Sequence, residues 1–376
     1  MKYFIIAGEQ SGDLHGSNLI KEILITDTSA VIECWGGDLM ESTGVKLLTH
    51  YRNTAFMGFV TVLKNLGQIR RNFYLCHQQI TDFNPDVIIL IDYPGFNLRI
   101  AGFAKSAGYR VFYYISPKLW AWNEKRVEKI RKFVERMYII FPFEVGFYEK
   151  HGIKAIYCGN PLLDETDNRI KSFPAKYKIR ESLGIGGKPV IALLAGSRIG
   201  EVEHNLPKML KVIDSFPDHQ FVLAGVRNLP EQLYRTIIGE KPVTLVRDRT
   251  YEVLQISEAA LVTSGTATLE TALFNVPQIV CYRADFFSML IAWLVVRVKF
   301  ISLVNLIMGK EVVRELVQYD LKKKSLISEL KAILPGGEKR GRILDDYKEL
   351  RRVLGEPGAS ARVAADMVRA IMSLES

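Results

Sequence analysis

The chain has 376 residues, of which 48% are hydrophobic and 24% are charged. This composition is typical of a globular protein with a core and excludes an intrinsically disordered chain, and the length fits two domains better than one. The formal net charge of +9 favours an anionic partner, such as nucleic acid, an acidic membrane surface or a phosphorylated substrate, and composition does not choose among them.

Strand and helix patterns alternate through the first part of the chain. The apolar run 2–7, which ends at Gly8, predicts a buried parallel strand, and 13–24 has helical spacing. Further strands are predicted at 87–91, 109–115 and 137–141, with one long basic helix over 118–136. This alternation predicts a doubly wound, Rossmann-like α/β domain over residues 1–165.

A stretch over 159–174, with prolines and little periodicity, is interpreted as a linker. The alternation then restarts, with predicted strands at 189–194, 220–224, 243–246, 259–263 and 278–282. These predict a second doubly wound domain over 175–335. Strand signals end at Glu311, so we expect residues 336–376 to form helices that pack back on the N-terminal domain or on a partner subunit.

Membrane insertion and metal binding find little support in the sequence. The longest charge-free part of the apolar stretch 286–308 is 286–296, with 11 residues, whereas a helix that crosses a bilayer needs roughly 20. It has the length to lie on a membrane but not to span one. The N-terminal apolar run is too short for a signal peptide, and the four cysteines form no CxxC pair, which argues against a zinc site or a disulfide framework.

The dinucleotide fingerprint GxGxxG and the Walker A sequence are both absent, which disfavours a dehydrogenase or an ATPase. Small polar residues instead follow predicted strands in both domains, and ligands bind beyond the carboxyl ends of parallel strands. We therefore expect a ligand cleft between the two domains.

Two junctions of the first domain carry polar residues. Ser11 and Asp13 lie in the segment GEQSGD after the first strand. They are either caps of the next helix or ligand contacts, and the sequence favours the two interpretations about equally. Asp92 follows the strand 87–91. It is a helix cap, a member of an ion pair, or a base that accepts a proton from an attacking hydroxyl.

Two junctions of the second domain suit a phosphate. Ser197 and Arg198 follow its first strand, and the segment 264–266 (Ser-Gly-Thr) opens a later helix, where free N–H groups attract anions. An arginine also binds a diphosphate bidentately. Glu270 lies one turn further, where a ribose hydroxyl pair would donate to it. Each segment has an ordinary reading as a cap or surface charge, but two in one sheet favour phosphate.

Eight motifs in this order resemble the lipid A disaccharide synthase family. They are GEQSGD at 8–13, IDYPGFN at 91–97, SPKLWAW at 116–122, PFE at 142–144, GNPLLD at 159–164, LLAGSRIGEVE at 193–203, SGTATLE at 264–270 and SLVNLIMGKEVVRELVQ at 302–318. The likeness runs from residue 3 to about residue 320. It departs where Asn160 replaces a histidine and where Gly95 leaves Asp92 as the only carboxylate of its motif.

The resemblance implies the two-domain glycosyltransferase-B architecture with a helical C-terminus. It implies that UDP-2,3-diacylglucosamine donates its sugar, with inversion, to the 6-hydroxyl of 2,3-diacylglucosamine 1-phosphate, giving a β-1,6 disaccharide and UDP without metal or organic cofactor. Asp92 and Arg198 match its catalytic residues. The family's nucleotide-side asparagine matches Asn305, and its N-terminal glutamate matches Glu9. We further expect Ser197, Ser264, Gly265, Thr266 and Glu270 to bind the UDP-sugar, and Ser11, Gly12 and Met57 to bind the acceptor and its acyl chains.

We therefore expect a cytoplasmic protein, peripheral on the anionic inner face of the inner membrane, with a homodimer as one possible assembly. The segments 55–60 and 286–296 are either acyl-chain surfaces or buried core. Nucleic-acid binding lacks a motif in which aromatic and basic residues interleave. Two rival functions stay open: another UDP-sugar enzyme, such as an epimerase or a peptidoglycan glycosyltransferase, and a non-enzymatic basic binder of membranes.

Overall fold

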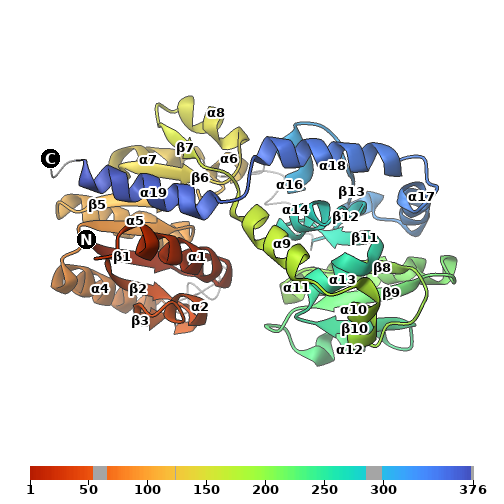
Figure 1. The fold of residues 1–376 in the computed structure, drawn as a ribbon. Helices are drawn as coiled ribbons and strands as arrows, with labels where there is room; N and C mark the ends of the chain where they lie inside the picture. The colour runs from red at the N-terminus through yellow and green to blue at the C-terminus, as the bar shows by residue number, and fades with distance from the viewer. Residues whose placement is uncertain (54–65, 123, 285–298, 374–376) are drawn as a thin grey trace. The chain divides into compact units, whose positions relative to one another are not determined.

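The chain forms two compact units, each with its own parallel sheet (Figure 1). The computed structural model describes residues 1–53, 66–122, 124–284 and 299–373. Unit 1 comprises Met1–Pro161 and Glu356–Ser376, and unit 2 comprises Leu162–Gly355. The predicted fold class, two doubly wound α/β domains with a helical C-terminus, is confirmed.

The sheet of unit 1 has the order β3-β2-β1-β4-β5-β6-β7, and all its strands are parallel. Its central strands are continuous apolar runs because helices cover both faces. The strands are β1 (Lys2–Ala7), β2 (Val31–Gly36), β3 (Lys46–His50), β4 (Val87–Ile91), β5 (Arg110–Tyr114), β6 (Arg136–Ile139) and β7 (Ala155–Tyr157). The helices are α1 (Gln10–Thr26), α2 (Asp38–Glu41), η1 (Tyr51–Asn53), α4 (Leu66–Phe83), α5 (Pro94–Ser106), α6 (Leu119–Trp122), η2 (Glu124–Arg126), α7 (Val127–Phe133), α8 (Phe143–Glu149) and α19 (Ala359–Met372).

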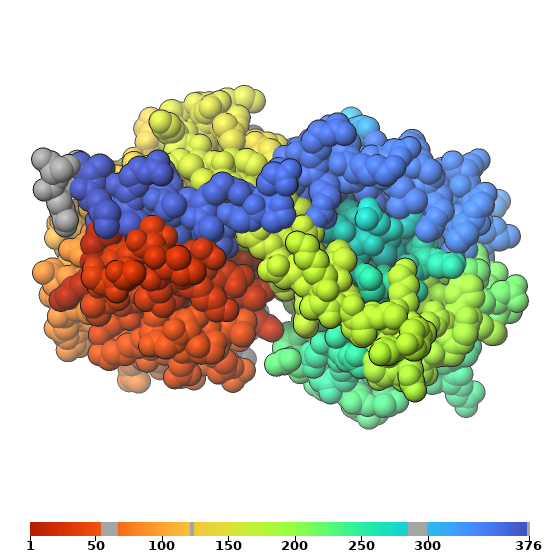
Figure 2. Space-filling view, viewed as in Figure 1, coloured from red at the N-terminus to blue at the C-terminus, as the bar shows by residue number. Residues whose placement is uncertain are grey.

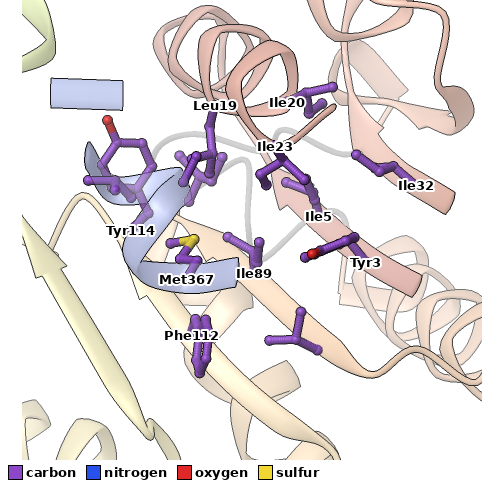
Figure 3. Close-up of a cluster of buried hydrophobic side chains, with 14 of the residues drawn as sticks. Tyr3, Ile5, Leu19, Ile20, Ile23, Ile32, Ile89, Phe112, Tyr114 and Met367 are labelled. Carbon is purple, nitrogen blue, oxygen red and sulfur yellow. The ribbon is translucent and has the colours of Figure 1, made fainter. Parts of the chain in front are cut away.

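The last helix, α19, completes the core of unit 1, although it comes from the far end of the sequence. It packs on α1, and Met367 lies among Leu19, Ile89 and Phe112 (Figure 3). Figure 2 shows the same helix, in blue, lying across the surface of this unit. The core of unit 1 therefore depends on about twenty residues that follow the whole of unit 2.

The sheet of unit 2 has the order β10-β9-β8-β11-β12-β13 and is also parallel throughout. Its strands are β8 (Val190–Leu194), β9 (Gln220–Gly225), β10 (Val243–Arg247), β11 (Ser257–Thr263), β12 (Gln278–Tyr282) and β13 (Arg314–Val317). Its helices are α9 (Pro161–Ser172), α10 (Lys176–Ser182), α11 (Ile199–Met209), η3 (Leu210–Ser215), α12 (Glu231–Ile238), α13 (Thr250–Ile256), α14 (Thr266–Leu273), α16 (Leu303–Met308), η4 (Gln318–Asp320), α17 (Lys323–Ile333) and α18 (Arg340–Leu354).

Several sequence expectations differ from the structure. The region 118–136 is not one helix but the short elements α6, η2 and α7, because Val134 has an extended backbone that leads into β6. The expected linker 159–174 contains α9, which opens with a proline at its first helical position. Strand signals do not end at Glu311, because β13 forms the edge of the second sheet.

The domain boundaries also differ from those expected. Contacts assign α9 and α18 to unit 2, so that only α19, and not the whole of 336–376, returns to unit 1. The reason is visible at Tyr347 of α18, a buried residue whose hydroxyl accepts from Gln278 Nε2 at 3.2 Å and donates to the carbonyl of Val276 at 3.3 Å. These bonds tie α18 to β12.

Each sheet has one point at which the strand order reverses. In unit 1 the central strand β1 pairs with β2 on one side and β4 on the other, and in unit 2 β8 pairs with β9 and β11. In open α/β sheets, ligands bind outside the carboxyl ends of the strands at such a switch point. The segments after β1, β4, β8 and β11 are therefore the places to look for a site.

Candidate functional site

In unit 1, the switch point brings the segment after β1 against the segment after β4. A Cβ atom on Gly8 would overlap the ring of Tyr93, with Cε1 2.6 Å away, so this approach requires glycine. Gly12 is buried, and its missing Cβ would lie 3.2 Å from that of Ala7, while Ser11 is exposed. Glycine at both positions lets α1 begin close to the end of β4.

Asp92 follows β4 and has a left-handed backbone conformation, which is uncommon for residues other than glycine. Asp92 has φ 43° and Tyr93 has φ 49°, both in the left-handed region. Two side chains hold the Asp92 carbonyl in place: the Tyr113 hydroxyl donates to it at 2.5 Å and Asn97 Nδ2 at 2.9 Å. Each such residue costs of the order of 1–3 kcal/mol, and strain of this kind clusters at functional sites.

The surroundings of Asp92 change its acidity. Burial raises the pKa of its carboxyl, and the charge of Glu9 raises it further, while Lys118 and the backbone N–H of Tyr93 lower it, leaving the pKa at about 6. Glu9 and Asp92, both predicted as site residues, therefore lie close enough to interact. A carboxylate with a pKa near the working pH is suited to accept a proton from a hydroxyl.

Asp13 differs from its expected role as a cap of α1. Its buried carboxylate accepts from the backbone N–H groups of Gly37 at 2.8 Å, Leu39 at 3.1 Å and Met40 at 3.0 Å. It therefore caps the short α2 and fixes the loop after β2. Helix α1 begins after Glu9, and among the described residues no side-chain bond caps its first turn. The capping reading is thus wrong for both Asp13 and Ser11.

In unit 2, the segment after β8 presents Arg198 at the start of α11. Gly196 has φ 115°, and a Cβ there would lie 2.6 Å from Cβ of Glu201, so the turn requires glycine. Glu201 accepts from the Ser197 N–H at 2.9 Å and lies 3.6 Å from the Arg198 guanidinium. The Arg198 side chain is 67% exposed. An exposed ion pair of this kind is weak and competes poorly with a bound diphosphate.

The neighbouring segment, after β11, opens the eight-residue helix α14. Gly265 is its N-cap, with φ 154°, and no side chain caps the first turn within the described part of the chain. Ser264 donates its hydroxyl to the carbonyl of Ile301 at 2.7 Å, and Thr266 is exposed. The structure therefore places the serine, glycine and threonine of this segment beside Ser197 and Arg198, at adjacent strand ends.

Glu270 lies one turn into α14 and is partly engaged. The Tyr251 hydroxyl donates to its Oε1 at 3.0 Å. Burial raises the pKa of Glu270 to about 7; Tyr251 acts to lower it and the nearby Glu165 to raise it. The half-buried carboxyl retains capacity to accept further hydrogen bonds. Tyr251 and Glu165 are neighbours that the sequence analysis missed, since nothing in their spacing links them to Glu270.

Asn305 makes its hydrogen bonds within unit 2. Its buried side chain donates from Nδ2 to the Val313 carbonyl and to Glu315, and its Oδ1 accepts from the N–H groups of Val312 and Val313, at 2.8–3.0 Å. An amide side chain has no further strong donor or acceptor sites. Asn305 therefore organises the segment between α16 and β13, and its contact with a nucleotide stays a prediction.

Glu144 is a buried carboxyl that the sequence analysis did not single out. It is 1% exposed and accepts from Ser116 Oγ, from Trp120 Nε1 at 3.1 Å and from the Phe141 N–H at 3.1 Å. Burial raises its pKa to about 7, and these donors act against that rise. Two of the quoted motifs, 116–122 and 142–144, meet in this cluster. The presence of both motifs was the one feature of the sequence that could have pointed to Glu144.

Further expectations concern the acyl-chain segments, metal binding and membrane crossing. Met57 and the segments 55–60 and 286–296 lie outside the described residues. Within the described ranges, no three His, Cys, Asp or Glu side chains are arranged to hold a metal ion. In the same ranges, no helix has both the length and the apolar character that a bilayer crossing requires.

Comparison with known proteins gives a consistent picture. The sequence model of the family described as Lipid-A-disaccharide synthetase matches residues 3–367. A lipid-A-disaccharide synthase of Geobacter sulfurreducens is 36% identical, covering 96% of this chain and 95% of that protein. One of Syntrophus aciditrophicus is 37% identical over 96% and 95%.

Solved structures show the same architecture at low sequence identity. UDP-GlcNAc 2-epimerase from Neisseria meningitidis, bound to UDP-GlcNAc, is 12% identical with a TM-score of 0.71, covering 98% of this chain and 100% of that one. The corresponding enzyme of Methanocaldococcus jannaschii, in complex with UDP-GlcNAc and UDP, is 13% identical with a TM-score of 0.62, covering 98% and 99%. At these identities the likeness concerns the fold alone, and it fits the glycosyltransferase-B architecture.

The family model covers almost the whole chain, and relatives above 30% identity span nearly their full length. The chain therefore belongs to the lipid-A-disaccharide synthase family and is a glycosyltransferase that forms the lipid A disaccharide from a nucleotide-sugar donor and a sugar-phosphate acceptor.

Proposed function

We propose that the enzyme transfers the sugar of UDP-2,3-diacylglucosamine to the 6-hydroxyl of 2,3-diacylglucosamine 1-phosphate. The products are the β-1,6-linked disaccharide 1-phosphate and UDP. The observation that carries this proposal is Asp92, a strained carboxylate at the switch point of unit 1 with a pKa of about 6. Inverting transfer needs one base on the face of the sugar opposite the leaving group.

In the proposed step, the acceptor O6 attacks the anomeric carbon of the donor as its proton passes to the Asp92 carboxylate. The O6–C1 bond forms while the bond between C1 and the phosphate oxygen breaks, and the electron pair of that bond leaves with UDP. The configuration at C1 changes from α to β because attack and departure occur on opposite faces. The protonated Asp92 then returns its proton to solvent.

The leaving UDP gathers negative charge, and unit 2 supplies groups that offset it. Arg198 is exposed and only weakly paired with Glu201, which lets its guanidinium turn toward a diphosphate. The N–H groups at the start of α14, after Ser264 and Gly265, add the partial positive charge of a helix N-terminus. Glu270 accepts from the ribose hydroxyls, and Ser197 and Thr266 contact the phosphates. Removing one such preorganised donor typically costs about 10²–10³ in rate.

On the acceptor side, we assign Glu9, Ser11 and Gly12 to the rim around Asp92, and Met57 with the segments 55–60 and 286–296 to the acyl chains. The enzyme then works as a peripheral protein on the anionic cytoplasmic face of the inner membrane. The net charge of +9 supports this, because basic surfaces are attracted to anionic lipids. A homodimer is a further proposal that light scattering of the purified protein tests.

The proposal is tested by mass spectrometry of the product that purified enzyme makes from the two acylated substrates. We expect a disaccharide 1-phosphate with a β linkage and one UDP released per disaccharide. We also expect a large loss of rate when the acceptor lacks its acyl chains. Conversion of the UDP-sugar to an epimer without acceptor, or equal use of acceptors with and without acyl chains, would refute it.

A further inference from the structure

The buried carboxyl of Glu144, in the first turn of α8, binds a segment that comes from a different part of the sheet. Its Oε1 accepts from Ser116 Oγ and from Trp120 Nε1, and its Oε2 accepts from the N–H of Phe141. The carboxyl thus joins residues 116 and 120, which follow β5, to Phe141, which follows β6. A carboxylate that accepts three bonds while buried fixes all three partners.

The segment held in this way follows β5, which is the neighbour of β4 in the sheet, and Asp92 follows the end of β4. The N–H of Asp92 donates to the carbonyl of Tyr114 at 3.1 Å, so the two strand ends are in register. The chain then turns sharply at Ile115, whose φ of 62° is a true outlier for a β-branched residue. An extended path after β5 would avoid the positive φ of Ile115, so contacts elsewhere must stabilise this turn.

Lys118 lies midway between the two residues that Glu144 holds. It is exposed, whereas Ser116, Pro117 and Leu119 are buried. Ser116 and Trp120, on either side of Lys118, are held by Glu144, which restricts the backbone of Lys118 between them. Lys118 is close enough to lower the pKa of the Asp92 carboxyl.

We propose that Glu144 is a positioning residue which, through Ser116 and Trp120, holds Lys118 beside Asp92. The inference rests on the proposed role of Asp92 as the base. It assigns a part in the reaction to two residues that do not touch the reacting atoms, and it explains why the motifs 116–122 and 142–144 occur together.

Other groups that face these carboxyls set the direction of the effect. Around Asp92, Glu9 after β1 raises its pKa and Lys118 after β5 lowers it, while the Tyr113 hydroxyl binds its carbonyl. The two charged groups oppose one another, so the loss of Lys118 leaves Glu9 unbalanced. Around Glu144, the hydroxyls of Tyr148 and Tyr157 remain neutral because burial raises their pKa values above the usual range.

The test is the pH profile of kcat/KM for the full-length enzyme and its variants. In Lys118→Met, we expect the acid limb to move upward by about 0.5 pH unit, which is about a threefold lower rate on that limb. Glu144→Gln moves it in the same direction, because the amide cannot accept from all three donors. The double variant moves it no further than either single change, since both act through one interaction.

Two further variants are controls for the expected shift of the acid limb. Glu9→Gln is expected to move the acid limb downward, because it removes the opposing charge. Lys129→Met, at an exposed lysine of α7, is expected to leave the limb in place. Trp120→Phe removes one hydrogen-bond donor to Glu144 and keeps an aromatic ring, so it also loosens the segment that Glu144 holds. This variant allows the same test if Glu144→Gln fails to fold.

Different results would overturn the role of Glu144 and Lys118 and the role of Asp92. A uniform loss of rate at all pH values in Glu144→Gln and Trp120→Phe, with the acid limb unmoved, would show that Glu144 is merely structural and would overturn the inference. An acid limb that Lys118→Met leaves unmoved would overturn it as well. Near-normal turnover of Asp92→Asn would instead remove the proposed base, and with it the function on which the inference rests.

Discussion

Carboxyl side chains in this enzyme do different work according to what surrounds them. Asp13 is buried and accepts from three backbone N–H groups, whereas Asp92 is half-buried beside Glu9 and has a raised pKa. The first arrangement uses both oxygens of the carboxylate for structure. The second leaves its oxygens available to a ligand, and that difference marks which aspartate is suited to chemistry.

Replacing Asp13 by alanine is expected to destabilise unit 1 without touching the reaction. Three N–H groups, of Gly37, Leu39 and Met40, would lose their buried acceptor, at a cost of about 1–3 kcal/mol for a buried group left unpaired. Urea denaturation measures the change. The matched control is Asp38→Ala at the start of α2, where the exposed pairs with His50 and Arg52 contribute little. Equal losses in the two variants would show that the Asp13 bonds are unimportant.

At the scale of elements, the close approach of the segments after β1 and β4 depends on a missing side chain. Gly8→Ala is expected to lower both stability and activity, because its Cβ would overlap the ring of Tyr93 and push the strained turn at Asp92 away. Gly146→Ala is the control: that glycine lies in α8 with no atom within 4 Å of an added Cβ. Alanine there is expected to stabilise by up to about 1 kcal/mol.

Thermal unfolding and kcat of the two variants check this prediction. An unchanged kcat in Gly8→Ala would show that the turn after β4 tolerates displacement. The close packing of Gly8 against Tyr93 would then not be needed to position Asp92.

Most central strands were predictable from the sequence, whereas among the edge strands only β10 was predicted. The run 87–91 reads as a buried strand because helices cover both faces of β4. In contrast, β3 (KLLTH) and β13 (RELV) mix polar and apolar residues at the sheet edges, and neither pattern is distinct from a loop. The region 118–136 shows helical spacing, but only Val127 and Ile130 of α7 are buried, too few to sustain one long helix.

The candidate site was predictable in part for a related reason. Residues directly after strands, such as Asp92 and Arg198, can be found from the strand pattern, since parallel strands end at one edge of the sheet. Glu144 could not, because its bond to Ser116 joins residues 28 apart in sequence and depends on the order of β5 and β6 in the sheet. The internal role of Asn305 likewise follows from the path of the chain between α16 and β13.

At the scale of the whole molecule, carboxyls in both units have raised pKa values, and stability should depend on pH. The pKa values of Glu144 and Glu270 are each about 7, above their values in the unfolded chain. The folded state therefore binds more protons than the unfolded state up to about pH 7, and stability falls as pH rises through that value. His15, whose pKa burial lowers to about 4, acts in the opposite direction but only below about pH 6.5.

Urea denaturation at pH 6.5 and pH 8 is therefore expected to show a lower free energy of unfolding at the higher pH. Glu144→Gln should flatten the dependence of unit 1, and Glu270→Gln that of unit 2. Stability that rises over this interval would contradict the assignment of both groups.

The proposed attachment to membranes also belongs to the whole molecule. With a net charge of +9, the enzyme is expected to sediment with vesicles that contain an anionic lipid and to bind vesicles of zwitterionic lipid less. Raising the salt concentration from about 0.05 M to about 0.5 M should weaken the anionic binding, because salt screens exposed charges. Binding that ignores both lipid charge and salt would favour attachment through apolar segments instead.

The central claim is that Asp92 takes the proton of the acceptor hydroxyl, and kcat of Asp92→Asn tests it most directly. Asp82→Asn, at an exposed carboxyl of α4, is the matched control, and UDP affinity measured by calorimetry reports on unit 2. The account predicts that Asp92→Asn lowers kcat by about 10²–10⁴ while UDP affinity and the control stay as in the wild type. Near-normal kcat in Asp92→Asn, with UDP binding intact, would contradict it.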